Sequence, residues 1–249
     1  MKLLSPEFGG TIACIHETRR QSIVETKTVP INERLVIGSL LAAAAGGFDA
    51  FTYLLHGGVF AGLQTGNLIL LGAHLGQGQF NLVWRFVVPI LAFVVGTMIA
   101  RLIQHQVKRY KRPLLQQQMI LVWELVLIIT VAILSPSLPD IPVSALISMA
   151  AAAQLQEFRK LKGGPFTSLM MTGNLRTVAE GLYDGIFHHS QPALQKAADI
   201  ATIIVSFVIG AGAMGFTVLH LGHFAILLPG VLLAIIWTIF WRNSKMLGD

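Results

Sequence analysis

Two short segments of the sequence decide the fold: GGVFAGLQTGNL at Gly57–Leu68 and GGPFTSLMMTGNL at Gly163–Leu175. They match one another with one inserted residue, and both begin with paired glycines and contain Thr-Gly-Asn. Thr-Gly-Asn is a poor helix interior, yet an Asn that precedes a good helical run is a plausible helix start. We therefore expect a break in each segment, followed by a helix at about Asn67–Leu75 and at about Asn174–Tyr183.

Long apolar runs surround the two segments. Apolar residues make up 54% of the 249 positions and charged residues 12%, whereas a soluble domain carries about 25% charged residues. A run of about 18 or more uncharged apolar residues is typical of a membrane-spanning helix. We expect an all-α, polytopic membrane protein with six spans, at about Leu35–Leu55, Phe86–Gln106, Gln116–Leu134, Ile141–Leu155, Ala198–Leu219 and Phe224–Trp241.

The charged residues favour a topology in which neither Thr-Gly-Asn segment crosses the bilayer. The short helices after the breaks do not reach across a core of about 30 Å. If the N-terminus is inside, 17 of the 18 basic residues then lie inside and only Arg85 lies outside, whereas two crossing segments would give a split of 10 to 8. Because basic residues stay on the cytoplasmic side, we expect six spans, two re-entrant segments and cytoplasmic termini.

The matching segments indicate an internal repeat. Each half reads as span, broken segment, span, span, with halves at about residues 35–136 and 141–242. Three spans per half is an odd number, so the second copy enters the membrane from the opposite side. Inverted 3+3 repeats with broken helices near the midplane are characteristic of secondary transporters. We expect a mobile cytoplasmic tail at residues 1–34 and one transmembrane domain at residues 35–249, with the two breaks facing each other or a cavity.

Part of the chain resembles a known family. The stretch GGFDAFTYLLHGGVFAGLQTGNLILLG at Gly46–Gly72 resembles the first signature of the YoaK-like family of bacterial membrane proteins, and QLQEFRKLKGGPFTSLMMTGNL at Gln154–Leu175 resembles the second. Many members have Gln-Asn where this chain has Gln154-Leu155. The resemblance, over about Leu35–Trp241, implies a multi-pass protein of the bacterial cytoplasmic membrane. It implies no substrate or activity, since the family is one of unknown function.

Two acidic residues fall within expected spans. Acids at membrane depth are costly, and they suggest function. Asp49, in GGFDAF, either takes part in function or caps the Gly57 loop. Glu124, in ILVWELVLII, either serves transport or proton coupling or hydrogen-bonds two helices together. We keep both alternatives for each residue.

The Thr-Gly-Asn segments supply the other candidate substrate-binding residues. Their amide and hydroxyl groups offer contacts to a ligand, and Asn67 and Asn174 are expected to cap their helices as well. Gly66 and Gly173 are expected to permit a backbone shape that larger residues cannot adopt. Arg176 pairs with Glu180 at i, i+4, either as a surface pair or as a gate charge. The full set of candidates is Asp49, Gln64, Thr65, Gly66, Asn67, Glu124, Gln154, Thr172, Gly173, Asn174 and Arg176.

Other kinds of site are not indicated. The single cysteine, Cys14, excludes an internal disulfide and a cysteine metal cluster. The histidines do not follow a zinc pattern, and no Ser/His/Asp set or phosphate loop appears in the sequence. The basic residues flank apolar runs, so they do not indicate nucleic acid. We expect no metal, no cofactor and no catalytic residues. We expect five glycines to allow close helix packing, namely Gly38, Gly96, Gly210, Gly212 and Gly215.

Three functions remain open. The first is a transporter or channel for a small solute, with its site at the midplane between the breaks. Two helix starts that point toward the bilayer centre would favour an anionic or dipolar solute. The second is a membrane-embedded enzyme that acts on lipid, and the third is a structural or regulatory membrane protein. The lipid bilayer is the expected partner, and the sequence is compatible with a homo-oligomer.

Overall fold

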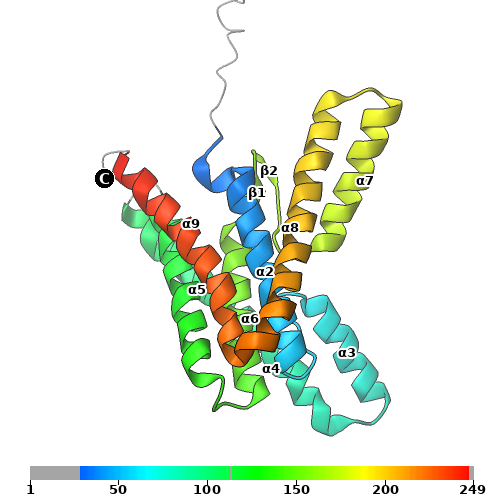
Figure 1. Cartoon of the computed structure of the whole chain (residues 1–249), viewed down its shortest axis with the longest axis vertical. Coiled ribbons are helices and arrows are strands. Elements are labelled where there is room, and N and C mark those ends of the chain that lie inside the picture. Colours follow the sequence, from blue (N-terminus) through cyan, green and yellow to red (C-terminus); the bar gives the residue numbers. More distant parts are fainter. Residues whose placement is uncertain (1–28, 111, 113, 247–249) are drawn as a thin grey trace, which may run out of the picture. The chain divides into compact units, whose positions relative to one another are not determined.

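The computed structural model describes residues 29–110, 112 and 114–246. Most of the expected N-terminal tail, Cys14 included, therefore lies outside the described residues. The described chain is almost wholly helical, as predicted (Figure 1). Its elements are η1 Ile31–Glu33, α2 Leu35–Leu55, α3 Gln64–Gly76, η2 Phe80–Leu82, α4 Val83–Val107, η3 Lys108–Tyr110, α5 Leu115–Leu134, α6 Asp140–Glu157, β1 Lys160–Leu161, β2 Gly164–Pro165, α7 Met171–Phe187, α8 Gln191–Leu221, η4 Gly222–Ile226 and α9 Leu227–Met246.

Several helices are long and apolar enough to cross a membrane. Among the described residues, four such stretches occur, at Leu35–Leu55, Phe80–Tyr110, Leu115–Leu134 and Gln191–Met246. The last of them contains α8, η4 and α9. Helix α6, which includes the expected fourth span, is not among the four. The helical membrane fold is thus supported, whereas the number of spans stays a prediction.

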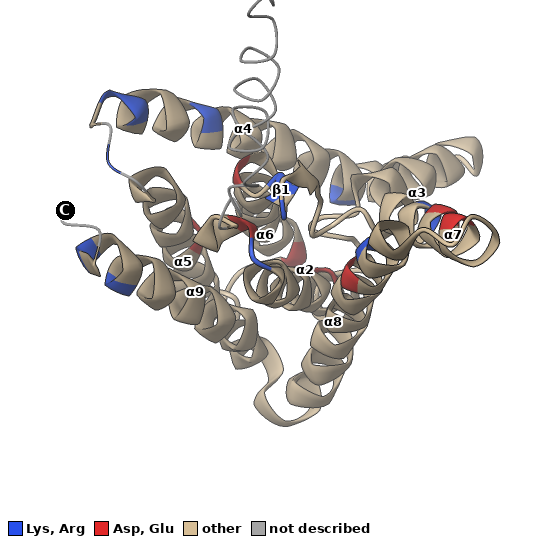
Figure 2. Cartoon of the chain, turned by 90° about the horizontal axis from the view of Figure 1, so that it is seen from above, with Lys and Arg blue, Asp and Glu red and all other residues tan. Residues whose placement is uncertain are grey.

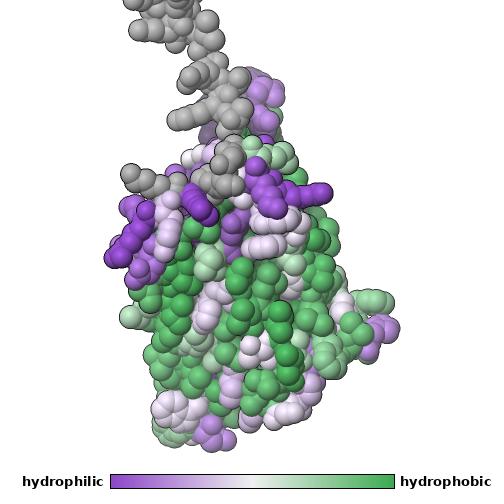
Figure 3. All heavy atoms as spheres, turned by 90° about the vertical axis from the view of Figure 1, so that its left-hand side faces the viewer, coloured by the Kyte–Doolittle hydropathy of each residue, from purple (hydrophilic) through white to green (hydrophobic). Residues whose placement is uncertain are grey.

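The exterior is apolar over a wide area. Large hydrophobic side chains such as Met98, Ile133 and Phe216 are 66%, 68% and 67% exposed. Figure 3 shows hydrophobic residues covering the middle of one face, with hydrophilic residues gathered toward one end. Figure 2 shows basic residues at the ends of α4 and α9 and also beside β1 and α7, and acidic residues on α2, α5, α6 and α7. Such a surface suits a hydrocarbon surrounding with polar ends.

Helices α2 and α6 form the centre of the helix bundle. Helix α2 packs closely on α8, and α6 packs closely on α4. Glycine permits the close approach: a Cβ at Gly210 would lie 2.0 Å from the Ala43 carbonyl oxygen, and a Cβ at Gly96 would lie 2.6 Å from the Met149 Cα. These two glycines confirm the predicted packing role. A Cβ at Gly38 would likewise lie 2.9 Å from Leu161 Cδ1, whereas Gly212 and Gly215 meet nothing within 4 Å, so the prediction is wrong for these last two.

A two-residue hairpin interrupts the helical pattern before α7. Strands β1 and β2 pair antiparallel, with Lys162 and Gly163 at the turn, where both residues have positive φ of 49° and 82°. Two positive φ angles are typical of the tight turn that suits a hairpin. Gly163 N–H donates to Glu33 at 2.8 Å, and Lys162 forms an ion pair with Asp199 at 2.6 Å. The hairpin is therefore tied to the start of the described helices and to α8.

Candidate functional site

The first broken segment is held by Asp49. Residues 57–63 leave the helical path between α2 and α3, beginning with positive φ at Gly57 and Gly58. The Asp49 carboxylate accepts the N–H of Gly62 at 2.6 Å and that of Leu63 at 3.4 Å. The carboxylate therefore lies at the N-terminal end of α3, where backbone N–H groups and the helix dipole favour negative charge.

Asn67 fastens the same segment from the other side. Its Oδ1 accepts the Phe60 N–H at 2.9 Å, and its Nδ2 donates to the Phe60 carbonyl at 2.7 Å and to Gln64 Oε1 at 2.9 Å. Asn67 is fully buried. A single side chain thus satisfies both backbone polar groups of one non-helical residue, Phe60, as buried backbone requires.

The second broken segment repeats this arrangement with different side chains. Asn174 donates to the Thr167 carbonyl at 3.0 Å, again to the residue seven positions earlier. Gln154, on α6, donates to Ser168 Oγ at 2.7 Å and to the Leu41 carbonyl at 3.0 Å. Gln154 therefore fastens the second segment to its preceding helix, as Asp49 fastens the first.

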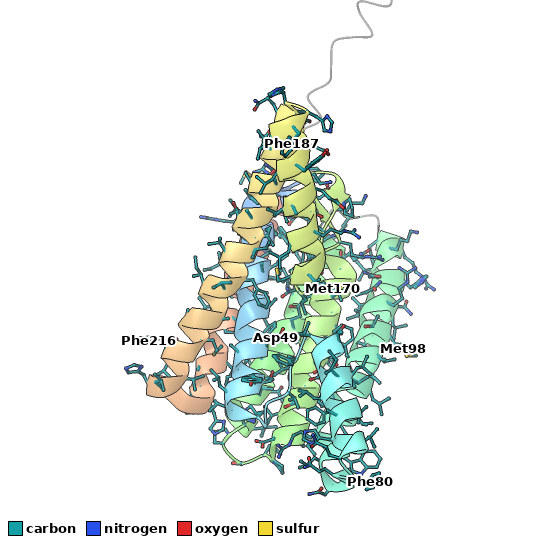
Figure 4. All side chains as sticks on the ribbon, turned by 90° about the vertical axis from the view of Figure 1, so that its right-hand side faces the viewer. Asp49, Phe80, Met98, Met170, Phe187 and Phe216 are labelled. Atoms are coloured by element: carbon teal, nitrogen blue, oxygen red, sulfur yellow. The ribbon has the colours of Figure 1, made fainter. Side chains whose placement is uncertain are left out.

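The two broken segments touch each other. A Cβ added to Gly62 would lie 2.1 Å from Leu169 Cδ2, so the leucine side chain rests directly on the glycine backbone. Figure 4 shows Asp49 and Met170, which precedes α7, at similar mid-height. From there α3 and α7 run toward opposite ends of the molecule (Figure 1). The structure thus brings the two segments together as expected.

The predicted helix starts were wrong in detail. Helix α3 begins at Gln64 and α7 at Met171, and neither helix has a side-chain cap hydrogen bond. Asn67 and Asn174 lie inside the first turns and bond backward to the extended segments. Neither Gly66 nor Gly173 is among the glycines with positive φ, so the expected backbone requirement is wrong. The breaks precede Thr-Gly-Asn.

Several candidates lie apart from the contact between the segments. Thr65, Thr172 and Gly173 are exposed on α3 and α7. Arg176 and Glu180 form an exposed i, i+4 pair at 3.5 Å, as the sequence indicated. Gln64 stays near the first segment, where its Nε2 donates to the Ala61 carbonyl at 2.7 Å.

Glu124 lies at the middle of α5 and is fully buried. Neither carboxylate oxygen has a hydrogen-bond partner among the described residues. The hydrogen bond between two helices that we considered for it is therefore not present in the described part of the chain.

One hydrogen-bonded cluster escaped the sequence analysis. His56, just after α2, contacts Asp140 through Nδ1 at 3.2 Å and Ser135 Oγ through Nε2 at 3.2 Å. Ser135 Oγ also lies 2.8 Å from His223 Nδ1. A Ser/His/Asp set thus does exist in space, contrary to the expectation. Ser135 and Asp140 flank the turn between α5 and α6, whereas His56 follows α2 and His223 lies in η4, so no local spacing could reveal the whole set.

Burial sets the electrostatics of this outer cluster, defined as His56, Ser135, Asp140 and His223. Desolvation lowers the pKa of the His56 imidazole, while the hydrogen bond and charge of Asp140 oppose that change and His223 adds to it. The Arg85 side chain approaches from α4 and donates to the Gly57 carbonyl at 3.4 Å. A neutral His56 can donate from Nδ1 to Asp140 and accept the Ser135 hydroxyl at Nε2.

A polar cleft lies at the other end of α6. Glu157 accepts hydrogen bonds from the side-chain amides of Gln104 at 2.8 Å, Gln116 at 2.7 Å and Gln117 at 2.7 Å. The cleft around Glu157 measures about 340 Å³ and is lined by Arg101, Gln104, His105, Lys108, Gln116, Gln156, Glu157 and Arg159. Across the described residues, no group of three His, Cys, Asp or Glu side chains is placed to hold a metal ion.

Comparison with known proteins agrees with this architecture. The chain is 28% identical over 200 residues to "UPF0700 transmembrane protein YoaK" of Bacillus subtilis (strain 168), covering 78% of this chain and 88% of the relative. No solved structure matches the chain significantly. The model of one family, "Protein of unknown function (DUF1275)", matches residues 37–239. Together with its membrane-capable helices, this match identifies the chain as a multi-pass membrane protein that belongs to the DUF1275 family.

Proposed function

We propose that this membrane protein is a transporter for a small solute, which alternates access to its two sides about the broken segments. The observation that carries the proposal is the direct contact of the two segments at Gly62 and Leu169. Extended backbone survives at membrane depth where protein or water satisfies it, and broken helices that meet near the midplane are typical of secondary transporters.

The helix packing supports an inverted 3+3 repeat with six spans. In that repeat α2 corresponds to α6, α3 to α7, α4 to α8 and α5 to α9. The packing agrees with this correspondence. Helix α2 packs on α8, and their counterparts α6 and α4 pack on each other. Helix α3 has 13 residues and α7 has 17, so their lengths of about 20 and about 25 Å fall short of a core of about 30 Å. We therefore treat both as re-entrant half-helices.

The two segments differ in a way that bears on the solute. The N-terminal end of α3 already faces the Asp49 carboxylate, so it offers no free positive field. At the start of α7, by contrast, the N–H groups of Leu169 and Met170 donate only to Thr167 Oγ1, at 3.4 and 3.3 Å. An anionic or dipolar solute would therefore contact the α7 segment, and Asp49 would exclude anions from the α3 segment.

Water access to the segments tests the proposal without a known solute. Two fully buried alanines provide a matched pair: Ala61 in the first broken segment and Ala151 in the middle of α6. Each is changed to cysteine in a Cys14→Ser background, and membranes are treated with a small charged thiol reagent. A transporter opens the segment to water, so Ala61→Cys should react at least tenfold faster than Ala151→Cys. Equal, slow reaction of both cysteines would contradict alternating access.

The outer cluster favours a second candidate, an acyl-transfer enzyme that acts on lipid. Asp140, His56 and Ser135 follow the order of contacts that activates a serine nucleophile. Against this function, Ser135 is 1% exposed, so a substrate does not reach its hydroxyl in this conformation. A fluorophosphonate probe separates the candidates: covalent labelling of Ser135, lost in His56→Gln, would favour the enzyme, and absence of labelling would favour the transporter.

A further inference from the structure

A buried carboxyl group without a partner lies midway along α5. Glu124 is 0% exposed, and neither oxygen accepts a hydrogen bond from the described residues. It takes no part in the ion pairs that those residues form. An ionised carboxylate in such a setting carries a desolvation penalty that nothing offsets. The group therefore needs a proton or a bound cation.

Two polar groups on α6 also lack partners among the described residues, namely Ser148 Oγ and Gln154 Oε1. Hydroxyl groups on these helices usually bond to their own backbone, as Thr52 does to the Phe48 carbonyl at 3.1 Å. Ser148 does not. Gln154 uses its amide nitrogen twice and leaves its oxygen without a donor. On α5, the indole Nε1 of Trp123, beside Glu124 in the sequence, also lacks a partner among the described residues.

Helix register places these groups near Glu124. Helices α5 and α6 pack against each other, and Gln116 near the start of α5 bonds to Glu157 at the end of α6. Because consecutive helices joined by a short turn run antiparallel, Glu124 lies opposite α6 about two turns before Glu157. At about 1.5 Å per residue, Ser148 lies within about 2 Å of that level along the axis, and Gln154 lies about 8 Å from it.

We propose that Glu124 is a proton-binding site that exchanges its proton with water by way of the cleft around Glu157. Binding adds one proton from water to a carboxylate oxygen and breaks no other bond. The new O–H can donate one hydrogen bond, and Ser148 Oγ, at the level of Glu124 along the helix axis, is an acceptor without a partner among the described residues. The charged and titratable groups toward the cleft are Glu157 itself and the lining Arg101, His105, Lys108 and Arg159.

A proton fits this site better than a metal cation. A cation held by oxygen atoms needs several ligands at short distance. The described residues provide no cluster of three acidic or histidine side chains, and Glu124 is the one carboxylate of this unpartnered set. A proton needs one carboxylate and one acceptor. Proton binding itself does not depend on the function proposed above; only the role of this proton as the coupling ion rests on it.

Infrared spectroscopy of the purified full-length protein in lipid tests the proposal. A protonated carboxylic acid has a carbonyl stretch that is distinct from that of a carboxylate, and it shifts when the acid proton is replaced by deuterium. We expect such a band at neutral pH, a shift of the band in D₂O, and its loss in Glu124→Gln. Glu180→Gln, which removes an exposed carboxylate on α7, should keep the band unchanged.

Three results would overturn the proposal. They are an unchanged band in Glu124→Gln, a band that does not shift in D₂O, and a band that disappears when sodium chloride replaces choline chloride, which would indicate a cation site. If Glu124→Gln does not fold, a hydrophobic carbodiimide that adds to protonated carboxyl groups is applied to the unmodified protein. Peptide mass spectrometry should then find the adduct on Glu124, and an unmodified Glu124 would refute proton binding. The Ala61→Cys test remains separate, so transport and proton binding can fail independently.

Discussion

The unequal fastening of the two broken segments yields a quantitative prediction. Asn67 makes three side-chain hydrogen bonds, whereas Asn174 makes one to a carbonyl and a weak contact to the Met171 sulfur at 3.5 Å. A buried hydrogen bond contributes about 1 kcal/mol net. Asn67→Ala should therefore lower the free energy of unfolding by about 3 kcal/mol and Asn174→Ala by about 1 kcal/mol.

The measurement is reversible unfolding in mixed detergent micelles, with helicity followed as the denaturing detergent increases. Thr65→Ala is the control, because Thr65 is an exposed neighbour on the same helix and its removal should cost less than about 0.5 kcal/mol. Equal costs for the two asparagine variants would refute the reasoning. It would mean that the hydrogen bonds to Phe60 do not carry the stability of the first segment.

Three further predictions follow from the packing, the outer cluster and the charges. Gly210→Ala should destabilise the protein by about 1–3 kcal/mol or prevent folding through its clash with the α2 backbone, whereas Gly212→Ala should be neutral or stabilise by up to about 1 kcal/mol, as thermal melts can show. Because the folded-state pKa of His56 lies below its usual 6.5, its contribution to stability should be complete above that pH and be lost as the pH falls through 6.5 toward the folded-state value; thermal melts from pH 8 to 5 should show a smaller decline in His56→Gln. In the cysteine-free background, a cysteine at Ser137 should react with an impermeant reagent from outside intact spheroplasts and one at Ser190 should not, and the reverse pattern would invert the topology.

The sequence predicted the helical layout well because apolar runs and charge clusters report directly on helices in an apolar medium. Helix α2 occupies the expected Leu35–Leu55. The prediction failed at the starts of α3 and α7. Asn67 and Asn174 form hydrogen bonds with the backbone seven residues earlier instead of capping their own helices. Sequence alone cannot distinguish the two kinds of hydrogen bond, since both use the same asparagine side chain near the start of a helix.

The candidate site was predicted only in part. Asp49 and Asn67 were found because polar residues stand out in apolar runs, and Asp49 does hold the Gly57 loop. Ser168, the hydrogen-bond partner of Gln154, and the cluster around His56 were missed. Both depend on contacts between residues that are far apart in the sequence or on different elements. Thr65 and Thr172 were selected for their chemistry, but they lie on exposed faces of their helices.

The exchange of partners between the halves has a consequence for how the protein is made. Because α2 packs on α8, and α6 on α4, neither half contains the helix that covers its own first helix. During synthesis α2 precedes α8, so the face of α2 around Gly46 lacks its contact with Phe207 until α8 has been made. In the inverted repeat that we propose, a half-length chain would meet this need by pairing with a second copy inserted in the opposite orientation.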